Sequence, residues 1–484
     1  THTLSLIMTI IRIKARLTAL TAFAVSIFAS TAAAEAPPVV VSIDWAHILR
    51  AIPREAYSLN AFQAFNPDSA ANPAWRENIA HINPGSIRYH TSGIISDSRT
   101  SEKGWLNHET RAWDIEKIRR ATAHWPRTAA AQITIHSWPA WMTSTPEKLL
   151  DEEQYDAYAA LCADLVRIIN TGLGLGVRRW EPMNERELAY VRALTRNDKP
   201  PQYDKVIEIW NRCARAMKQA DPAIQVGGPA ISSAARVDLI RQFIRGTRDN
   251  LDFFSCHEYS TNDPSLPDET IFDSASNFGP KITRIQKILK QEIPGRPIDI
   301  VLNEFNINWT WHSKDPRMID HKGAVFDALA MTSVLNHGGT ATYAWNDVDN
   351  IYGKMSRAWK LRPSAHVYHH LNASFIGDSV SVTTADGKKV VPFAVIRKDG
   401  GRALMLVNRS AASLDVRIGS VKRIQRDDSV APSRAMFRRA EISADGYKTT
   451  PLSTDSAGLP DAGQLVLSPV SVTFIIEEIA TPEP

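Results

Sequence analysis

Residues 203–228 read YDKVIEIWNRCARAMKQADPAIQVGG, and this stretch holds one helix followed by one strand. Apolar and charged residues in Tyr203–Ala220 are spaced as in an amphipathic helix. Ala220-Asp-Pro222 ends that helix, because proline cannot continue it. The short apolar run Ile224–Gly228 that follows has the length of a buried strand. The stretch therefore predicts one helix–strand unit of an α/β protein.

The same unit recurs over roughly 290 residues, a length typical of a (β/α)₈ barrel. The predicted strands are Tyr57–Phe62, Ser86–His90, Ala131–His136, Val177–Glu181, Ile224–Gly228, Asp252–His257, Ile298–Asn303 and Thr340–Trp345. The predicted helices are Pro73–His81, Trp113–His124, Glu152–Asn170, Tyr203–Ala220, Ala234–Arg245, Lys281–Gln291 and His321–Asn336. A doubly wound sheet is the alternative, but no GxGxxG-type phosphate loop follows the first strand. The pattern favours an α/β protein with a (β/α)₈ TIM barrel at residues 57–370.

The pattern changes beyond residue 370. Short runs of β-forming residues there alternate with Gly, Asp and Ser turns, as in an antiparallel β-sandwich. We therefore expect a C-terminal sandwich domain at residues 371–484. The segment at residues 37–56 precedes the barrel, and its apolar run Val39–Ile43 is a candidate additional strand of the sandwich.

Residues 1–36 have the order of a secretory signal peptide. The basic residues Arg12, Lys14 and Arg16 precede the apolar stretch Leu17–Phe28, and the small residues Ser30–Ala34 follow, with cleavage expected near Ala34 or Ala36. The apolar stretch is shorter than the ~20 residues that a membrane span requires. We therefore expect this leader to be removed, leaving a soluble periplasmic or secreted protein with no stable membrane span.

The composition is that of an ordinary globular protein and argues against some partners. The 484 residues are 44% hydrophobic and 22% charged, which excludes intrinsic disorder. The net charge is +4, and loss of the first 34 residues, which carry three basic residues and no acidic one, lowers it to +1. So neutral a surface has no general attraction for nucleic acid. The three cysteines, Cys162, Cys213 and Cys256, fit no zinc pattern and are predicted to be buried thiols.

The polar residues at the ends of the predicted strands are the candidates for a site, because barrel active sites lie at the C-terminal strand ends. Glu185 follows the fourth strand and Glu304 follows the seventh, and each comes directly after an asparagine. Acetal hydrolysis needs two such carboxylates, one as proton donor and one as nucleophile or base. The pair predicts a glycoside hydrolase that acts on a carbohydrate without a metal or organic cofactor.

Other polar and aromatic residues at or just after strand ends are candidates for binding the substrate, since aromatic faces suit the C–H faces of sugars. These candidates are Asn184, Arg88, His90, His136, Trp138, His257, Tyr259, Trp309 and Trp345. Arg88 and Arg186 are candidates for binding a uronic acid. The histidine cluster at residues 366–370 has no carboxylate at ligand spacing, so we expect it to be structural.

Three segments of the predicted barrel resemble retaining glycoside hydrolases of clan A, and most of all family 39. They are Ile87-Arg-Tyr-His90, Val226-Gly-Gly-Pro-Ala230 and Asp252-Phe-Phe-Ser-Cys-His-Glu-Tyr259, and the likeness covers roughly residues 57–370. Family 39 contains β-xylosidases, α-L-iduronidases and endoglycosidases of bacterial exopolysaccharides. The resemblance implies a barrel with a sandwich domain and double displacement at the anomeric carbon.

The resemblance also implies roles for individual residues. Glu185 would be the acid/base, Glu304 the nucleophile, and Asn184 would bind the hydroxyl next to the anomeric carbon. Tyr259 would hydrogen-bond the nucleophile. One departure keeps a second acid open: the family usually reads Trp-Asn-Glu-Pro, whereas this chain reads Trp-Glu-Pro-Met-Asn-Glu from residue 180, which makes Glu181 a rival.

A non-catalytic carbohydrate-binding or polysaccharide-assembly protein on the same scaffold is the alternative, because a fold does not fix a function. The two carboxylates argue against it, since charged carboxylates repel each other and binding alone has no need of the pair. The residues leave the sugar, the linkage and the choice between exo and endo action open.

Overall fold

The computed structural model describes residues 37–61, 66–90, 104–422, 436–452 and 465–479. The predicted signal peptide and Phe62, the last residue of the first predicted strand, lie outside these ranges.

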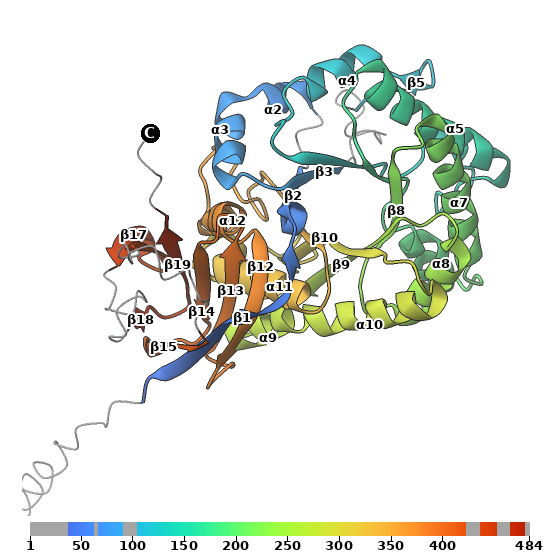
Figure 1. The fold of residues 1–484 in the computed structure, drawn as a ribbon. Coiled ribbons are helices and arrows are strands. Elements are labelled where there is room, and N and C mark those ends of the chain that lie inside the picture. Colours follow the sequence, from blue (N-terminus) through green and yellow to red (C-terminus); the bar gives the residue numbers. More distant parts are fainter. Residues whose placement is uncertain (1–36, 62–65, 91–103, 423–435, 453–464, 480–484) are drawn as a thin grey trace, which may run out of the picture. The chain divides into compact units, whose positions relative to one another are not determined.

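Eight parallel strands close into a barrel, which confirms the predicted (β/α)₈ architecture (Figure 1). In chain order these strands are β2 (Tyr57–Ala61), β3 (Ser86–His90), β6 (Ala130–Thr134), β7 (Arg179–Glu181), β8 (Gln225–Ile231), β9 (Phe253–Thr261), β10 (Asp299–Asn308) and β11 (Ala341–Ala344). Each corresponds to one predicted strand. Two further short strands, β4 (Leu106–Asn107) and β5 (Ala112–Trp113), pair with each other outside the barrel.

Helices surround the barrel strands (Figure 1). They are α2 (Pro67–Ala71), α3 (Pro73–Ile82), α4 (Ile115–Thr122), α5 (Tyr155–Val166), α6 (Leu194–Arg196), α7 (Tyr203–Ala220), α8 (Val237–Thr247), α9 (Asp268–Ser276), α10 (Phe278–Glu292), α11 (His321–Asn336) and α12 (Pro363–Ser374). The seven predicted helices are present. Four of these helices, α2, α6, α9 and α12, were not predicted. The buried residues of α12 include His370 and Asn372, so this helix has no clear polar face.

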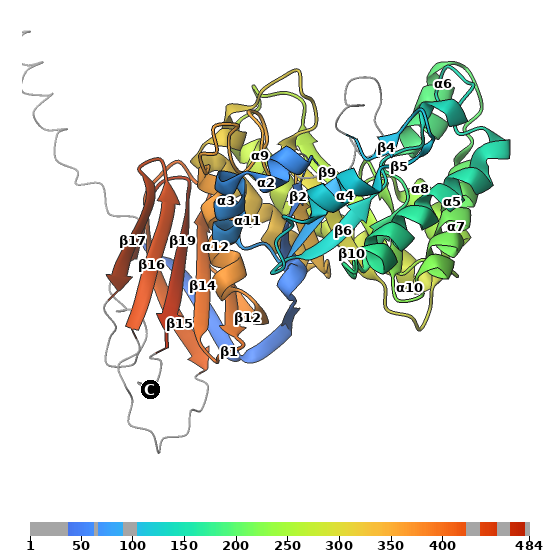
Figure 2. The ribbon, with the colours of Figure 1, turned by 90° about the horizontal axis from the view of Figure 1, so that it is seen from above.

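The C-terminal strands form one mixed sheet, mostly antiparallel (Figure 2). Its order is β17-β16-β19-β14-β13-β12-β1-β15-β18. The strands are β1 (Val39–Ile52), β12 (Gly377–Thr384), β13 (Val390–Arg397), β14 (Arg402–Asn408), β15 (Leu414–Lys422), β16 (Met436–Ser443), β17 (Gly446–Leu452), β18 (Leu465–Leu467) and β19 (Ser471–Glu478). The leading strand β1 pairs with β12 and β15, so the run Val39–Ile43 lies inside this sheet.

Both faces of the sheet are apolar, as the period of two along its strands shows. On β14, Leu404 and Leu406 belong to a small core within the sheet. The alternate residues Met405 and Val407 belong to the large core that also contains side chains of α11 and α12. The sheet therefore has an inner core of its own and packs against the barrel helices with its other face.

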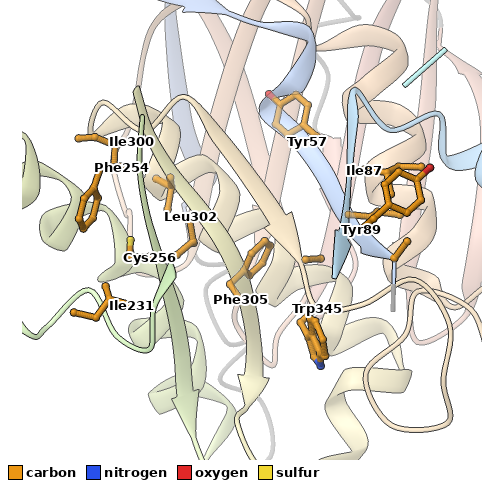
Figure 3. Close-up of a cluster of buried hydrophobic side chains, with 14 of the residues drawn as sticks. Tyr57, Ile87, Tyr89, Ile231, Phe254, Cys256, Ile300, Leu302, Phe305 and Trp345 are labelled. Carbon is orange, nitrogen blue, oxygen red and sulfur yellow. The ribbon is translucent and has the colours of Figure 1, made fainter. Parts of the chain in front are cut away.

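A close-up of the large core shows how β9 and β10 pack beside each other (Figure 3). Phe254 is in register with Ile300, and Cys256 with Leu302. The register becomes irregular between Leu302 and Glu304. An irregularity of this kind changes which residues face each side of a strand, and here it lies next to the predicted nucleophile.

The three cysteines are buried and unpaired, as predicted. No helix among the described residues is both long enough and apolar enough to cross a lipid bilayer.

The histidine cluster lies between α3, α12 and β17. His81 stacks on His369 with ring centroids 4.2 Å apart, and its Nε2 lies 3.2 Å from Nδ1 of His366. His366 stacks on Tyr447, and Nε2 of His370 lies 2.9 Å from the Tyr447 hydroxyl. These rings therefore contact one another and Tyr447 of β17.

Candidate active site

Glu304 lies inside the barrel near the C-terminal end of β10. Asn303 also turns inward there, donating from Nδ2 to Glu181 at 2.7 Å. Consecutive residues of a regular strand point to opposite faces, so the irregular register after Leu302 accounts for two adjacent inward side chains. The sequence alone gave no sign of this irregularity.

Three nitrogen groups gather around one oxygen of Glu304. Nη1 of Arg88 lies 3.0 Å from Oε1, Nε2 of His90 lies 3.2 Å away, and Nε2 of His257 lies 3.5 Å away. The other oxygen, Oε2, accepts a hydrogen bond of 3.0 Å from the Tyr259 hydroxyl. Oε2 thus has fewer polar contacts than Oε1 and is the oxygen better placed to react.

The surroundings keep Glu304 ionised. Burial by itself would raise the pKa of this carboxyl, but His257, His90 and Arg88 outweigh the burial, and the pKa falls well below its usual range. Burial also raises the pKa of Tyr259, helped by the charges of Glu304 and Glu185, so its hydroxyl remains a donor. Glu304 therefore has the protonation state that a nucleophile needs.

Glu185 lies four residues beyond the end of β7. Its backbone is left-handed, with φ at 52°, and its N–H donates to the carbonyl of Ala230, which is itself left-handed with φ at 51°. A non-glycine residue in this region costs on the order of 1–3 kcal/mol and recurs at functional sites. The side chain is 27% exposed, and its Oε1 lies 2.8 Å from Nδ1 of His257. Glu185 is thus open to the cleft while one oxygen is held.

The two carboxylates are close together. One oxygen of Glu185, one of Glu304 and a ring nitrogen of His257 all lie within 4.8 Å of one another. Carboxyl groups ~5–5.5 Å apart are typical of retaining glycosidases, whereas inverting enzymes have ~6.5–9.5 Å. The observed separation favours the retaining geometry.

The same three side chains are the one group of acidic, His or Cys residues in the described ranges that is close enough to share a metal ion. The guanidinium of Arg88 contacts Glu304 directly, however, and would repel a cation there. The donor set fits a proton-transfer site better than a metal site.

Glu181, the rival acid, has a different environment. It is fully buried and accepts hydrogen bonds from Thr134 and Ser255, both at 2.5 Å, and from Asn303. Nε of Arg88 lies 2.7 Å from its Oε2. Burial would raise the pKa of Glu181, but Arg88 and the hydroxyl donors lower it. Glu181 is therefore a permanently charged partner of Arg88, with neither the exposure nor the proton that an acid requires.

A cleft of about 500 Å³ opens above the two carboxylates. Six of the predicted binding residues line it beside Glu185 and Glu304: His90, His136, Asn184, Tyr259, Trp309 and Trp345. Burial lowers the pKa of both His90 and His136, so these rings are neutral near pH 7. The cleft therefore presents neutral imidazoles, an amide and indole faces, which are groups suited to sugar hydroxyls and C–H faces.

Three of the predicted binding residues are not among those that line the cleft. Arg88 and His257 are fully buried behind the carboxylates and act by positioning them. Trp138 is 5% exposed, donates from its indole to the carbonyl of Lys148 and carries the guanidinium of Arg186 on its ring. Trp138 is thus a core residue, and neither Arg88 nor Arg186 is placed to bind a uronic acid.

Several cleft residues were missed as site residues. Trp311 and Tyr352 form an edge-to-face pair with ring centroids 4.9 Å apart. The others are Leu188, Arg192, Ser232, Ser233, Arg236 and Glu258. Ser232 and Ser233 directly follow β8, and that position was the available signal. Tyr352 follows β11 in an irregular segment, and no sequence pattern marks it.

The model of the glycosyl hydrolases family 39 matches residues 148–382, which contain both Glu185 and Glu304. This match confirms the predicted resemblance to that family. None of the curated protein sequences matches this chain.

Solved structures similar to this chain include several glycoside hydrolases at low sequence identity. A monomeric beta-xylosidase from Caulobacter crescentus CB15 has a TM-score of 0.62 and 17% identity, over 91% of this chain and 100% of that chain. A family 39 enzyme from Xanthomonas axonopodis pv. citri has a TM-score of 0.64 and 13% identity, over 94% and 100%. CelM2, a bifunctional glucanase-xylanase from a metagenome library, has a TM-score of 0.66 and 16% identity, over 92% and 100%. At identities this low, the TM-scores show a similar fold and nothing further.

Proposed function

We propose that this chain, a glycoside hydrolase whose residues 148–382 match family 39, cleaves an oligo- or polysaccharide by double displacement with Glu304 as nucleophile and Glu185 as acid/base. The observation that carries the proposal is the pair itself. Glu304 is ionised and buried among Arg88, His90, His257 and Tyr259, while a partly exposed Glu185 has an oxygen within 4.8 Å of it. The non-catalytic alternative gives no reason for this pair.

In the first step Oε2 of Glu304 attacks the anomeric carbon and the bond to the leaving oxygen breaks. That oxygen takes a proton from Glu185. Nδ1–H of His257 donates to Oε1 of Glu185, which leaves Oε2 of Glu185 to carry the catalytic proton. Arg88 and His90 remain on Oε1 of Glu304 and hold the carboxylate in line with the sugar. The products are a glycosyl ester on Glu304 and a free alcohol.

In the second step Glu185, now ionised, takes a proton from water, and the resulting oxygen attacks the anomeric carbon. The ester bond breaks and Glu304 recovers its negative charge. Three nitrogen groups and the Tyr259 hydroxyl surround Glu304, and they stabilise that returning charge. Two inversions leave the anomeric configuration unchanged.

The substrate class proposed is a β-xyloside-like oligosaccharide or a bacterial exopolysaccharide. The open cleft and its indole faces support a sugar chain as the ligand, and one of the similar structures is a beta-xylosidase by its title. The signal-peptide pattern of residues 1–36 supports export to the periplasm or the medium. Sequencing the N-terminus of protein recovered from the periplasm tests the export.

The catalytic proposal is tested by screening aryl β-xylosides, arabinosides, glucuronides and extracted bacterial exopolysaccharides. Proton NMR of the first product formed should show the anomeric configuration of the substrate, and the Glu304→Gln protein should show no turnover. Release of the opposite anomer would contradict double displacement. Full activity of Glu304→Gln would remove the nucleophile assignment.

A further inference from the structure

Two arginines that the catalytic steps leave unused line the cleft near Glu185. Arg192 belongs to a π-helical turn, η5 (Leu188–Ala193), that follows Glu185 along the chain. Arg236 is the last residue of the segment between β8 and α8, and it lines the same cleft. We call Arg192 and Arg236 the cationic wall. It stands on the segments that follow β7 and β8, the two neighbouring strands that position Glu185.

The opposite side of the cleft is aromatic. Trp309, Trp311, Trp345 and Tyr352 follow β10 and β11, on the side of Glu304. A leaving group must contact Glu185, because it takes that residue's proton. The transferred sugar therefore lies toward the aromatic side, and the leaving sugar extends along the cationic wall.

The guanidinium of Arg236 is anchored on one side. Its Nε donates to the Ser232 hydroxyl at 3.1 Å and lies 3.7 Å from an oxygen of the buried Glu187. Glu187 is in turn fixed by the backbone N–H of Ser232 at 2.7 Å. Within the described residues, neither Nη nitrogen of Arg236 donates a hydrogen bond, and Arg192 makes no ion pair. Anchored at Nε, the fork of Arg236 is available for a planar anion.

Glu258, an acidic residue that lines the same cleft, already has a cationic partner. Glu258 lines the cleft, but its Oε1 lies 2.9 Å from Nζ of Lys281. Its Oε2 accepts from the backbone N–H of Ala234 at 3.1 Å. Glu187 offsets part of the charge of Arg236 and is itself buried. The wall beside Glu185 therefore remains positive toward the cleft.

We infer that Arg192 and Arg236 bind an anionic group, a carboxylate or a sulfate, on the sugar that leaves with the proton of Glu185. The inference rests on the proposed function, and it makes the enzyme specific for an acidic sugar on the leaving-group side. It moves acid recognition away from Arg88, which is occupied by Glu181 and Glu304. It also moves it away from Arg186, which donates to the Asn184 carbonyl and the Ser137 hydroxyl.

The test uses the acceptor step of a retaining enzyme. An activated aryl glycoside that the protein turns over forms the ester on Glu304, and an added sugar then enters the space of the leaving group. Three acceptors share one ring and differ only at carbon six: methyl β-glucoside, methyl β-glucuronide and methyl β-glucoside 6-sulfate. Mass spectrometry measures the ratio of acidic to neutral transfer product, and this ratio is independent of how much protein is folded.

We expect the wild-type protein to favour an acidic acceptor, and the Arg192→Gln/Arg236→Gln double variant to lower the ratio about three- to tenfold, as for partly exposed charge pairs. High salt should lower the ratio as well, because it screens exposed charges. Arg196→Gln is the matched control, since Arg196 is exposed on α6 and does not line the cleft. Preference for the glucuronide identifies a uronic acid, and preference for the sulfate identifies a sulfated sugar.

Two results would contradict the inference alone, and a third would also contradict the proposed function. Equal transfer to all three acceptors shows that no anion is recognised. A preference that survives in the double variant shows that other residues recognise it. If no aryl glycoside forms the ester in the first place, the proposed function fails and the inference falls with it.

Discussion

Arg88 and Glu181 form a fully buried ion pair, in which Nε of Arg88 lies 2.7 Å from Oε2 of Glu181. The same guanidinium donates from Nη1 to Oε1 of Glu304. It also donates from Nη2 to Oδ1 of Asn184 at 2.7 Å. Glu181 therefore positions Arg88, and Arg88 positions Glu304. Glu181, the alternative candidate for the acid, therefore helps to position the nucleophile through Arg88.

Removing the charge of Glu181 should mainly lower the stability of the folded protein, and it should lower activity only through the position of Arg88. Glu181→Gln leaves Arg88 buried without its ion partner, and breaking a buried pair typically costs about 3–5 kcal/mol. We expect the free energy of unfolding in urea to fall by about this amount. Activity should fall equally for substrates with good and poor leaving groups. If azide restores the turnover of the Glu181→Ala protein, Glu181 is the acid/base.

The hydroxyl of Tyr259 should matter for rate more than for folding. It donates to Oε2 of Glu304, the proposed attacking oxygen, at 3.0 Å. A hydrogen bond to a charged group contributes about 1.5–3 kcal/mol, so Tyr259→Phe should lower kcat about 10- to 100-fold. Tyr203→Phe is the matched control, because the buried Tyr203 hydroxyl has no hydrogen-bond partner within the described residues. Steady-state kinetics on one aryl glycoside measures both, and equal rates for the two variants would contradict the role of Tyr259.

Much of the fold could be predicted because its signals are local. Strands such as Gln225–Ile231 are short, mostly apolar runs between amphipathic helices, and the barrel follows from their number and order.

The site was predictable in its two carboxylates and less so in its surroundings. Glu185 and Glu304 follow strand ends, which sequence can locate. Whether a side chain such as Trp138 faces the cleft or the core depends on packing between distant segments, here with Tyr158 and Tyr190. The burial of Arg88 likewise depends on partners from β7 and β10. These long-range contacts leave no trace in local spacing.

The histidine cluster should make the protein less stable as the pH falls. Burial, then neighbouring histidines, lower the pKa of His366 to about 4 and that of His370 to about 3. An unfolded histidine titrates near about 6.5, so between that pH and about 4 the unfolded chain binds protons that the folded chain does not. Each such proton lowers the free energy of unfolding by up to about 1.4 kcal/mol per pH unit.

The measurement is urea unfolding at a series of pH values from 7 to 4. His366→Gln should flatten the fall in stability over this window, because it removes one group that takes up a proton on unfolding. His47→Gln, at an exposed position on β1, serves as the control and should leave the slope as in the wild type. An unchanged slope in His366→Gln would contradict the role of the cluster.

The decisive prediction separates Glu185 from Glu304 by the substrates that each variant can still use. Glu304→Ala lacks the group that forms the glycosyl ester, so turnover of every substrate should collapse. Glu185→Ala keeps that group and lacks the proton donor, so substrates with poor leaving groups should suffer most. An aryl glycoside that leaves as a stable phenolate needs no proton and should still form the ester on Glu304.

The ester should then accumulate in Glu185→Ala, because no base remains to activate water. A burst of phenolate followed by slow turnover should be visible by absorbance. Azide needs no base, so it should enter the space left by the missing side chain and attack the anomeric carbon. The bond from that carbon to Glu304 then breaks, which restores part of the turnover. The product should be a glycosyl azide with the anomeric configuration of the substrate, since two inversions have occurred. If azide has no effect and good and poor leaving groups are equally impaired, the proton donor is a residue other than Glu185.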